Sequence, residues 1–364
     1  MKKYKICVYA ISKNEEKNVE QWYTSMKEAD EIYVLDTGST DKTVEILKGL
    51  GVHVEQKSIN PWRFDVARNE SLKLIPSDTD IYVCTDLDEI FLPGWRNELE
   101  NKWENDTTQA YYRYNWSLDE YGNPTLSFNY NKIHNKDFKW KYPVHEILIY
   151  TGNKENKTIT LENVILNHYQ ESTKNRSSYL PLLKLAVEEN PNDTRNLYLL
   201  SREYICYNNW QECINTSKKY LAVNENTYYA ERCAVMRYIG RSYKMLGDYK
   251  NSKLWFENSI KIAPNIRDGY VECGMLEYDF YNFGNAISFF ESALLIKENS
   301  LDVINEIFSW DDTVYRLLSA CYLHVHKVQK SLEYIEIAMD MNPNSEENKK
   351  QKELIERVIK YFKP

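Results

Sequence analysis

The chain has 364 residues, which is long for one hydrophobic core and suits two domains of ordinary size. Hydrophobic residues make up 43% and charged residues 27% of it, a composition that excludes disordered, collagen-like and low-complexity proteins. The net charge of -8 gives no overall attraction to nucleic acid or to an anionic membrane surface, so we expect no nucleic acid partner.

Targeting and redox features of the sequence indicate a cytoplasmic protein. No stretch approaches the roughly 18 apolar residues of a membrane-spanning helix, and the apolar run at 6–11 is shorter than the core of a signal peptide. The 7 cysteines are an odd number without a C-x-x-C pair, which favours reduced thiols that are mostly buried as small core residues.

The first part of the chain alternates short β-branched runs with polar helical stretches. We expect strands over 4–12, 31–37, 52–58 and 80–86, and helices near 17–27, 41–48 and 64–74. This order predicts an α/β domain with a parallel sheet and crossover helices. Later apolar runs at 110–116, 128–134 and 158–168 lack intervening helix signals and should add mixed or antiparallel strands.

From residue 177 onward the strand pattern stops, and apolar residues recur at helical spacing. One stretch matches all six tested positions of the tetratricopeptide (TPR) template: Gly240, Tyr243, Ser252, Phe256, Ser259 and Pro264. Partial copies include Gly274, Ala286, Phe290 and Ala293, an earlier one beginning at Ser201, and a later one beginning at Ser319 after an insertion around 299–312. Small residues let paired helices approach closely while the aromatic residue fills the adjacent space.

These patterns predict two domains: an α/β domain over 1–175 and an all-α, TPR-like helical repeat domain over 176–364. A generic helical bundle with accidental matches is the alternative for the second. Stacked helix pairs curve into a concave surface, so we expect this domain to bind an acceptor peptide or a second copy of the chain as a homodimer.

Four motifs follow successive strands, at the edge where the carboxyl ends of a parallel sheet meet. After the first strand, the amides around Asn14 and the carboxylate of Glu15 could contact a nucleoside; an ordinary acidic helix start is the alternative. After the second, Asp36 can accept a hydrogen bond from a base or ribose, Gly38 turns the chain, and Ser39 can cap the next helix.

The third and fourth motifs contribute a cation and a pair of carboxylates. Arg68 can fork onto a carboxylate or a phosphate, or it can pair with Asp36 or Asp86 to hold the site together. Asp86 and Asp88 alternate after a buried strand, which places both carboxylates on one face, where they could hold a divalent cation against a diphosphate.

In this order the motifs resemble those of the inverting family 2 glycosyltransferases of the GT-A fold, a Rossmann-like mixed sheet, and the resemblance covers about residues 4–170. It implies Mg²⁺ or Mn²⁺ on Asp88 and a UDP-sugar donor. The nucleotide-sugar-binding residues that it implies are Ile11, Glu15, Asp36, Arg68, Asp86 and Leu87. Val144-His145-Glu146 and Asn167-His168-Tyr169, followed by TPR-like helices, resemble the sublancin-type peptide S-glycosyltransferases.

Glu146 is the best carboxylate for the general base that an inverting displacement needs, with Asp119 and Asp137 as competitors. His145 is a second catalytic candidate, and the GT-A resemblance implies that His168 returns to the metal; a structural role is the alternative for both histidines. Three tryptophans could stack on a base or a sugar or lie in the core: Trp62, Trp116 and Trp140.

We therefore expect transfer of a single hexosyl or N-acetylhexosaminyl group from a UDP-sugar to a peptide, protein or glycan acceptor. The E-D and Q-x-x-R-W motifs of polysaccharide synthases are absent, which argues against processive polymerisation. A catalytically silent nucleotide-binding scaffold whose repeats bind a protein is the alternative. A nucleotidyltransferase would need a glycine-rich phosphate loop after the first strand, and residues 10–16 contain no glycine.

Overall fold

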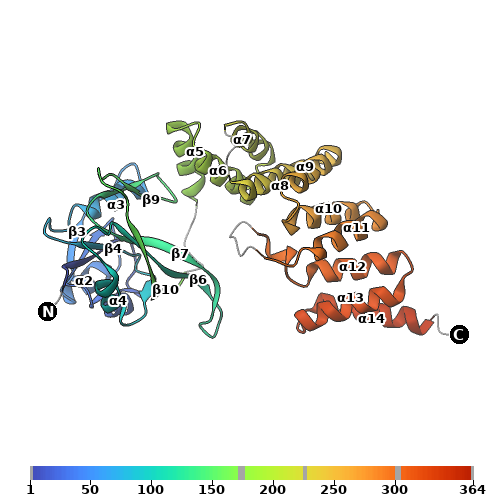
Figure 1. Ribbon diagram of the computed structural model, residues 1–364, viewed down its shortest axis with the longest axis horizontal. Helices are drawn as coiled ribbons and strands as arrows, with labels where there is room; N and C mark the ends of the chain where they lie inside the picture. The colour runs from blue at the N-terminus through green and yellow to red at the C-terminus, as the bar shows by residue number, and fades with distance from the viewer. Residues whose placement is uncertain (1–2, 171–176, 224–227, 300–304, 362–364) are drawn as a thin grey trace. The chain divides into compact units, whose positions relative to one another are not determined.

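A computed structural model of the chain describes residues 3–170, 177–223, 228–299 and 305–361. The chain forms two compact units, Met1–Ala186 and Val187–Pro364 (Figure 1). The division falls within helix α5 (Tyr179–Glu189), whereas the expected boundary between residues 175 and 176 lies outside the described residues. An α/β region is followed by an all-α region, which confirms the predicted fold class.

The first unit is built on an 8-stranded sheet with the order β3-β2-β1-β4-β7-β6-β10-β5. The strands of this sheet are β1 (Ile6–Ser12), β2 (Glu31–Asp36), β3 (His53–Gln56), β4 (Ile81–Cys84), β5 (Glu89–Phe91), β6 (Gln109–Leu118), β7 (Pro124–His134) and β10 (Thr158–His168). Four helices before α5 accompany it: α1 (Val19–Met26), α2 (Thr43–Gly49), α3 (Phe64–Leu72) and α4 (Trp95–Lys102). A separate antiparallel pair consists of β8 (Phe138–Lys141) and β9 (Ile147–Tyr150).

The predicted parallel half of the sheet is confirmed, because β3, β2, β1 and β4 all pair in parallel. Ser12 lies opposite Asp36 in the register of β1 and β2, so the two carboxyl ends finish level with each other. The other half is mixed, also as predicted: β7 is antiparallel to β4 and β6, and β10 is parallel to β6.

Alternate residues of β1 pack into two separate hydrophobic cores, one on each face of the sheet. Because both faces are buried, the sequence of this strand is a continuous apolar run. Ile6, Val8 and Ala10 face the core formed with helices α1, α2 and α4. Cys7 and Tyr9 face the opposite side, where α3 and β8 cover the sheet. The side chains that α3 and β8 contribute to the candidate site therefore lie against the sheet face that carries Tyr9.

Several short elements were not anticipated from the sequence: β5, α4, β8 and β9. Strands of three or four residues are too short to show an alternating pattern. Helix α4 begins at Trp95 after Gly94, whose φ of 91° only glycine adopts readily, and its sequence is polar apart from Trp95 and Leu99.

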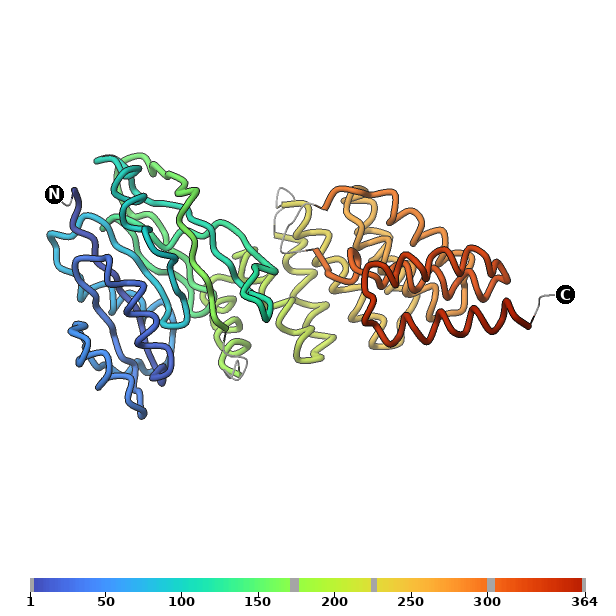
Figure 2. The backbone as a smooth tube through the Cα atoms, turned by 90° about the horizontal axis from the view of Figure 1, so that it is seen from below, coloured from blue at the N-terminus to red at the C-terminus, as the bar shows by residue number. Residues whose placement is uncertain are grey.

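The second unit consists of successive helix pairs, stacked side by side in Figure 2. Its helices are α6 (Thr194–Cys206), α7 (Trp210–Val223), α8 (Tyr229–Met245), α9 (Tyr249–Ile262), α10 (Arg267–Asp279), α11 (Phe283–Leu295), α12 (Thr313–His324), α13 (Val328–Met341) and α14 (Glu346–Tyr361). A short 3-10 turn, η1 (Ile307–Ser309), precedes α12.

The repeat positions predicted from the sequence meet inside the pairs. A Cβ on Gly240 would stand 2.4 Å from the ring of Phe256, and a Cβ on Gly274 would stand 2.5 Å from Phe290. Each glycine thus lets an aromatic ring from the second helix of its pair lie against the backbone of the first. In the pair α12 and α13, the hydroxyls of Ser319 and Ser331 each donate to the main-chain carbonyl oxygen of the other residue at 2.8 Å.

Six of the seven cysteines are buried and Cys206 is exposed, in agreement with the expected core role of most of them. Within the described ranges, no helix combines the length and the hydropathy that crossing a bilayer requires.

Candidate active site

The loops that follow β1 and β2 are tied together at the carboxyl edge of the sheet. Asn14 N–H donates to Ser39 Oγ at 2.8 Å, and Glu15 N–H donates to Thr43 Oγ1 at 2.7 Å. Asn14, which has a φ of 58°, accepts a hydrogen bond from Thr40 N–H at 2.7 Å. The amides of Asn14 and Glu15 therefore donate within the protein, and contact of this loop with a nucleoside stays a prediction.

Asp36 closes the turn at the end of β2 and is fully buried. Oδ1 accepts from the amides of Gly38 and Ser39 at 3.1 and 3.0 Å, while Oδ2 accepts from the hydroxyls of Ser12 at 3.0 Å and of Ser39. A carboxylate offers about four acceptor positions, and all of them are used here. These contacts shape the loop after β2, and a hydrogen bond from a base or ribose to Asp36 stays a prediction.

Arg68 lies on the face of α3 that packs against the sheet and is almost completely buried. Its Nη2 lies 2.6 Å from Asp86 Oδ1, and its Nε donates to Glu146 Oε1 at 3.0 Å. The guanidinium also lies over the ring of Trp140, 5.4 Å from its centroid. Arg68 thus joins two predicted site carboxylates: its pairing with Asp86 is the alternative that the sequence analysis left open, whereas its contact with Glu146 was not expected.

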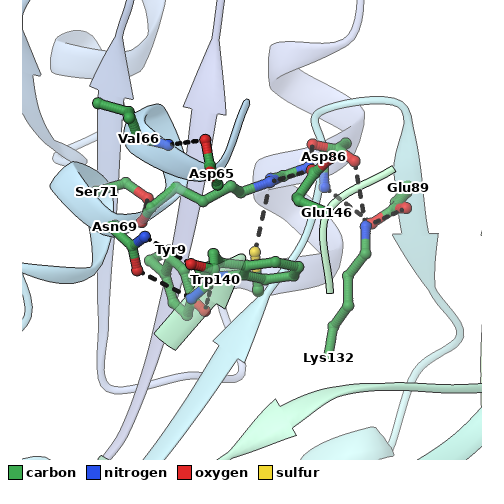
Figure 3. Close-up of polar contacts among 12 residues, drawn as sticks. Tyr9, Asp65, Val66, Asn69, Ser71, Asp86, Glu89, Lys132, Trp140 and Glu146 are labelled. Atoms are coloured by element: carbon green, nitrogen blue, oxygen red, sulfur yellow. Dashed lines mark hydrogen bonds and ion pairs between the residues drawn. The ribbon is translucent and has the colours of Figure 1, made fainter. Parts of the chain in front are cut away.

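Lys132 of β7 occupies the other side of Asp86 (Figure 3). Its Nζ lies 2.9 Å from Glu89 Oε1 and 3.2 Å from Asp86 Oδ2, and the lysine side chain is only 6% exposed. Glu89, also buried, accepts from Tyr114 Oη–H at 2.8 Å and from Asp86 N–H at 2.8 Å. The result is a continuous chain of charges from Glu146 to Glu89.

This network contains two cations, Arg68 and Lys132, against three carboxylates. Burial opposes ionisation of Asp86, but the charges of Arg68 and Lys132 lower the pKa of Asp86 well below its usual value. Burial and the charge of Asp86 raise the pKa of Glu89 despite its contact with Lys132. Asp86, whose side chain is 33% exposed, is therefore held ionised between two buried cations, where an ionised carboxylate is useful for binding.

Asp88 and His168 lie side by side at the same edge. The pairing of β10 with β5 puts His168 opposite Glu89, and His168 Nε2 is 3.6 Å from Asp88 Oδ2. On the other side of the ring, Nδ1–H donates to the carbonyl oxygen of Trp116 at 3.1 Å. Burial opposes protonation, but the hydrogen bond and charge of Asp88 raise the pKa of His168 above its usual value.

The remaining predicted residues lie around these groups. Ile11 is half-buried at the end of β1, and Leu87 is 2% exposed in the turn between β4 and β5. His145 has a φ of 51°, and its ring contacts the edge of Tyr179 with centroids 5.4 Å apart. Glu15 accepts from Asn18 Nδ2–H at 2.7 Å.

A cavity of about 290 Å³ opens between the loops after β1 and β2, lined by Asn14, Glu15, Glu16, Lys17, Asn18, Asp41 and Tyr169. Tyr169 N–H donates to the carbonyl oxygen of Asp88 at 2.8 Å, which connects the cavity wall to the carboxylate pair. Glu15 is the one predicted site residue in the cavity wall.

The tryptophans and rival carboxylates have distinct surroundings. Trp140 is buried and donates to Tyr9 Oη, whereas Trp116 is 36% exposed, with its ring 4.9 Å from that of His168. Asp119, a competitor for the base, instead accepts the amides of the turn between β6 and β7.

The sequence analysis missed Lys132, Glu89 and Tyr114. Lysines on alternating strands are usually exposed, and no local pattern marks Lys132 as buried. Glu89 was visible as the residue after Asp88, but its role depends on partners from β6 and β7.

Comparisons with known proteins agree with this geometry. Residues 7–153 match the model of the family described as glycosyl transferase family 2. A curated relative, an uncharacterized glycosyltransferase of Rickettsia bellii (strain RML369-C), is 32% identical over 142 residues. That alignment covers 37% of this chain and 47% of the relative, so the chain spans about half the length of the curated relative it matches. Both findings support a family 2 glycosyltransferase domain in the first part of the chain.

Solved structures with similarity to the chain share a lower sequence identity with it. MamA shares 15% identity at a TM-score of 0.37, over 45% of this chain and 86% of that one. YrrB, described as a TPR protein with an unusual peptide-binding site, shares 14% identity at a TM-score of 0.37, over 48% and 82% of the two chains. Because both TM-scores are low, the repeat fold of the second unit depends on the helix packing described above.

Proposed function

We propose that the protein is a metal-dependent, inverting glycosyltransferase. It moves a single hexosyl or N-acetylhexosaminyl group from a UDP-sugar to a peptide, protein or glycan acceptor in the cytoplasm. The observation that carries the proposal is the pairing of Asp88 with His168 beside the buried network around Asp86. A sublancin-type activity on a peptide is the most specific form of this proposal.

The donor set around Asp88 fits a divalent cation. The hydrogen bond from His168 Nδ1–H to Trp116 leaves Nε2 as the ring nitrogen that faces Asp88 Oδ2, so a cation held beside Asp88 would take the place of the proton on Nε2. Among the described residues, no group of three histidine, cysteine or acidic side chains could hold a metal ion. Mg²⁺ and Mn²⁺ are commonly held by one or two protein ligands with phosphate oxygens completing the shell, so the bound diphosphate would supply the rest.

When bound, the cation would neutralise charge on the departing diphosphate. The chain's own residues orient the donor. Arg68 and Lys132 fix the Asp86 carboxylate from two sides, so it needs no reorganisation when the donor binds. Asp36 holds the loop after β2, and the half-buried Ile11 lines the donor site. Leu87 contributes through its main chain, because its side chain is buried.

For the base we propose Glu146, which would take the proton of the attacking acceptor group. Arg68 holds one oxygen of this carboxylate at 3.0 Å, and the side chain remains 11% exposed. His145, the preceding residue, is the second candidate for this role. Glu15 would contact the nucleoside end of the donor from the wall of the 290 Å³ cavity. Helices of the second unit would bind the acceptor or a second copy of the chain.

Donor hydrolysis tests this proposal without knowledge of the acceptor. A panel of UDP-sugars is incubated with the full chain and Mn²⁺ while UDP release is measured. Asp88→Ala should slow release by at least about 10²-fold through lost charge stabilisation, as should EDTA. Asp106→Ala is the matched control, because Asp106 is an exposed carboxylate of the same unit that pairs with Lys157.

Two outcomes would count against the proposal. Wild-type turnover in the Asp88→Ala variant or in EDTA would remove the metal assignment. UDP binding without hydrolysis of any donor, together with no transfer to any acceptor, would favour the catalytically silent scaffold.

A further inference from the structure

The segment before α12 lies on the first helices of two other pairs. Residues 305–312, here called the insert, precede α12 and contain the turn η1. Their side chains reach α8 and α10, and Figure 1 shows this orange segment on the inner side of the bend that α8, α10 and α12 form. Stacked helix pairs curve into a concave surface that can bind an extended ligand. The insert therefore occupies the surface where an extended ligand would lie.

An acidic side chain anchors the insert. Glu306 Oε1 lies 2.7 Å from Arg241 Nη2 and 3.5 Å from Arg237 Nη1, both on α8. The amide of Glu306 and the hydroxyl of Ser309 donate to Asp268 Oδ1 on α10, at 2.8 and 2.9 Å. Helices α8 and α10 thus contact both a carboxylate and the main chain next to it. A free anion offers no main chain to contact, so this combination is suited to a peptide.

Aromatic side chains make the second set of contacts. The guanidinium of Arg267 lies 3.7 Å from the ring centroid of Trp310, and that of Arg241 lies 5.5 Å from Phe308. Arg267 also donates to the carbonyl oxygen of Ser309 at 3.0 Å. By contrast, Ile307 between these anchors is 82% exposed. The arginines therefore recognise a carboxylate followed by aromatic rings.

The surface that the insert covers carries three arginines, Arg237, Arg241 and Arg267. Two carboxylates of α10, Asp268 and Glu272, lie beside them. Burial lowers the pKa of Arg267, and this arginine donates to the main-chain carbonyl oxygens of Ser309 and Ile296. A carboxylate at this surface, such as that of Glu306, therefore lies close to several cations.

The insert leaves some buried polar atoms at this surface without a hydrogen-bond partner in the part of the chain that the structure describes. Asp268 Oδ2, Arg267 Nε and Trp310 Nε1 are buried without a hydrogen-bond partner among the described residues. Leaving such groups unsatisfied is unfavourable. A ligand that supplies a donor to Asp268 Oδ2 and an acceptor to Arg267 Nε would therefore bind better than the insert does.

We propose that the inner surface of α8 and α10 is a binding site for an acidic peptide segment that carries aromatic residues, and that the insert is its intramolecular stand-in. The partner binds by displacing residues 305–312. Glu306 and Trp310 of the insert mark the positions of the partner's carboxylate and aromatic ring. This site does not depend on the proposed sugar transfer, and its test requires no activity measurement.

The test uses the full chain and a fluorescein-labelled peptide with the sequence of residues 305–312, with binding measured by fluorescence anisotropy. In the double variant Glu306→Ala/Trp310→Ala, the tethered competitor is weakened, so the peptide should bind at least about tenfold more tightly than to wild type. Adding Arg241→Ala and Arg267→Ala to this variant should abolish the gain. Ile307→Ala is the matched control, because this exposed side chain should leave the insert in place.

Equal affinity for wild type and the double variant would overturn the proposal, as would a gain that survives removal of the two arginines. A peptide with lysine in place of its glutamate should bind at least about tenfold more weakly, and equal binding would refute carboxylate recognition. If circular dichroism shows that the double variant does not fold, hydrogen exchange of the wild-type protein tests instead whether the peptide displaces the insert. Saturating peptide must then speed exchange of the amides of 305–312, and unchanged exchange would refute displacement.

Discussion

Replacing Lys132 by methionine tests whether the charges of the first unit act as a set. Methionine keeps most of the side-chain volume but removes the cation that lies 2.9 Å from Glu89 and 3.2 Å from Asp86. At an effective dielectric constant of about 20, each of these pairs corresponds to roughly 5 kcal/mol of gross attraction, most of which offsets the desolvation of the charges. The net effect of removing one partner is the smaller quantity that an experiment measures.

We expect Lys132→Met to lower the free energy of unfolding of the first unit by about 3 to 5 kcal/mol, the usual cost of leaving a buried charge unpaired. Glu89 dominates this estimate, because it is 2% exposed and loses the only cation that pairs with it in the part of the chain that the structure describes. Asp86 contributes less, since its side chain is 33% exposed and it keeps Arg68. Lys157→Met is the matched control: this lysine also lies between two carboxylates but is 41% exposed, and its loss should cost about 0 to 1 kcal/mol.

The assay is urea unfolding followed by hydrogen exchange of peptides from β1 and β4, because a chain of two units need not unfold in one step. Adding Glu89→Gln should recover at least about 2 kcal/mol, since the amide can accept from Asp86 N–H and donate to Tyr114 Oη without carrying charge. Burial already raises the pKa of Glu89, so without Lys132 it takes up a proton as the pH falls, and the defect should be smaller at pH 5 than at pH 8. A cost of Lys132→Met below about 1 kcal/mol, or no recovery with Glu89→Gln, would refute the reasoning.

Three further predictions concern packing, pH and the loop after β2. Gly240→Ala should destabilise the helical unit by about 1 to 3 kcal/mol in thermal melting, because its Cβ would lie 2.4 Å from a buried ring. Gly284→Ala, with nothing within 4 Å, should be neutral or stabilise slightly. Burial lowers the pKa of His134 to about 4, so protonation is resisted in the folded state. The free energy of unfolding should then fall by about 3 kcal/mol between pH 7 and 4, a loss that His134→Gln removes and the exposed control His53→Gln does not. Asp36→Ala should weaken UDP binding in calorimetry while Asp36→Asn largely preserves it; equal weakening by both would indicate direct contact with the ligand.

The sequence predicted those parts of the candidate site that depend on strand ends. In a parallel sheet the carboxyl ends of neighbouring strands meet at one edge whatever their loops contain, so residues after β1, β2 and β4 had to converge. Ser12 and Asp36 are indeed register partners, and Asp88 lies on the same edge. His168 reaches Asp88 through the pairing of β10 with β5, an antiparallel contact that only the family resemblance suggested.

The parts that escaped prediction depend on contacts distant in sequence. Lys132 meets Glu89 and Asp86 across 43 and 46 residues, and nothing near it in the sequence marks it as buried. The glycine and aromatic pairs of the repeats could be predicted because both partners belong to one helix pair at a fixed offset. The contacts of the insert do not recur from repeat to repeat, so periodicity gave no sign that Glu306 would reach α8.

The two units also differ in how completely their buried charges are satisfied. In the first, every carboxylate of the network from Glu146 to Glu89 has a cation within 3.2 Å, so the network keeps its geometry before any ligand binds. In the second, Asp268 and Arg267 each retain a buried polar atom without a partner among the described residues, although the insert covers them. A fully satisfied set favours one arrangement and resists change, whereas an incompletely satisfied one gains from exchange of its occupant. We therefore expect the carboxyl edge of the sheet to be rigid and α8 and α10 to exchange the insert for a partner, a difference that hydrogen exchange of the two regions measures directly.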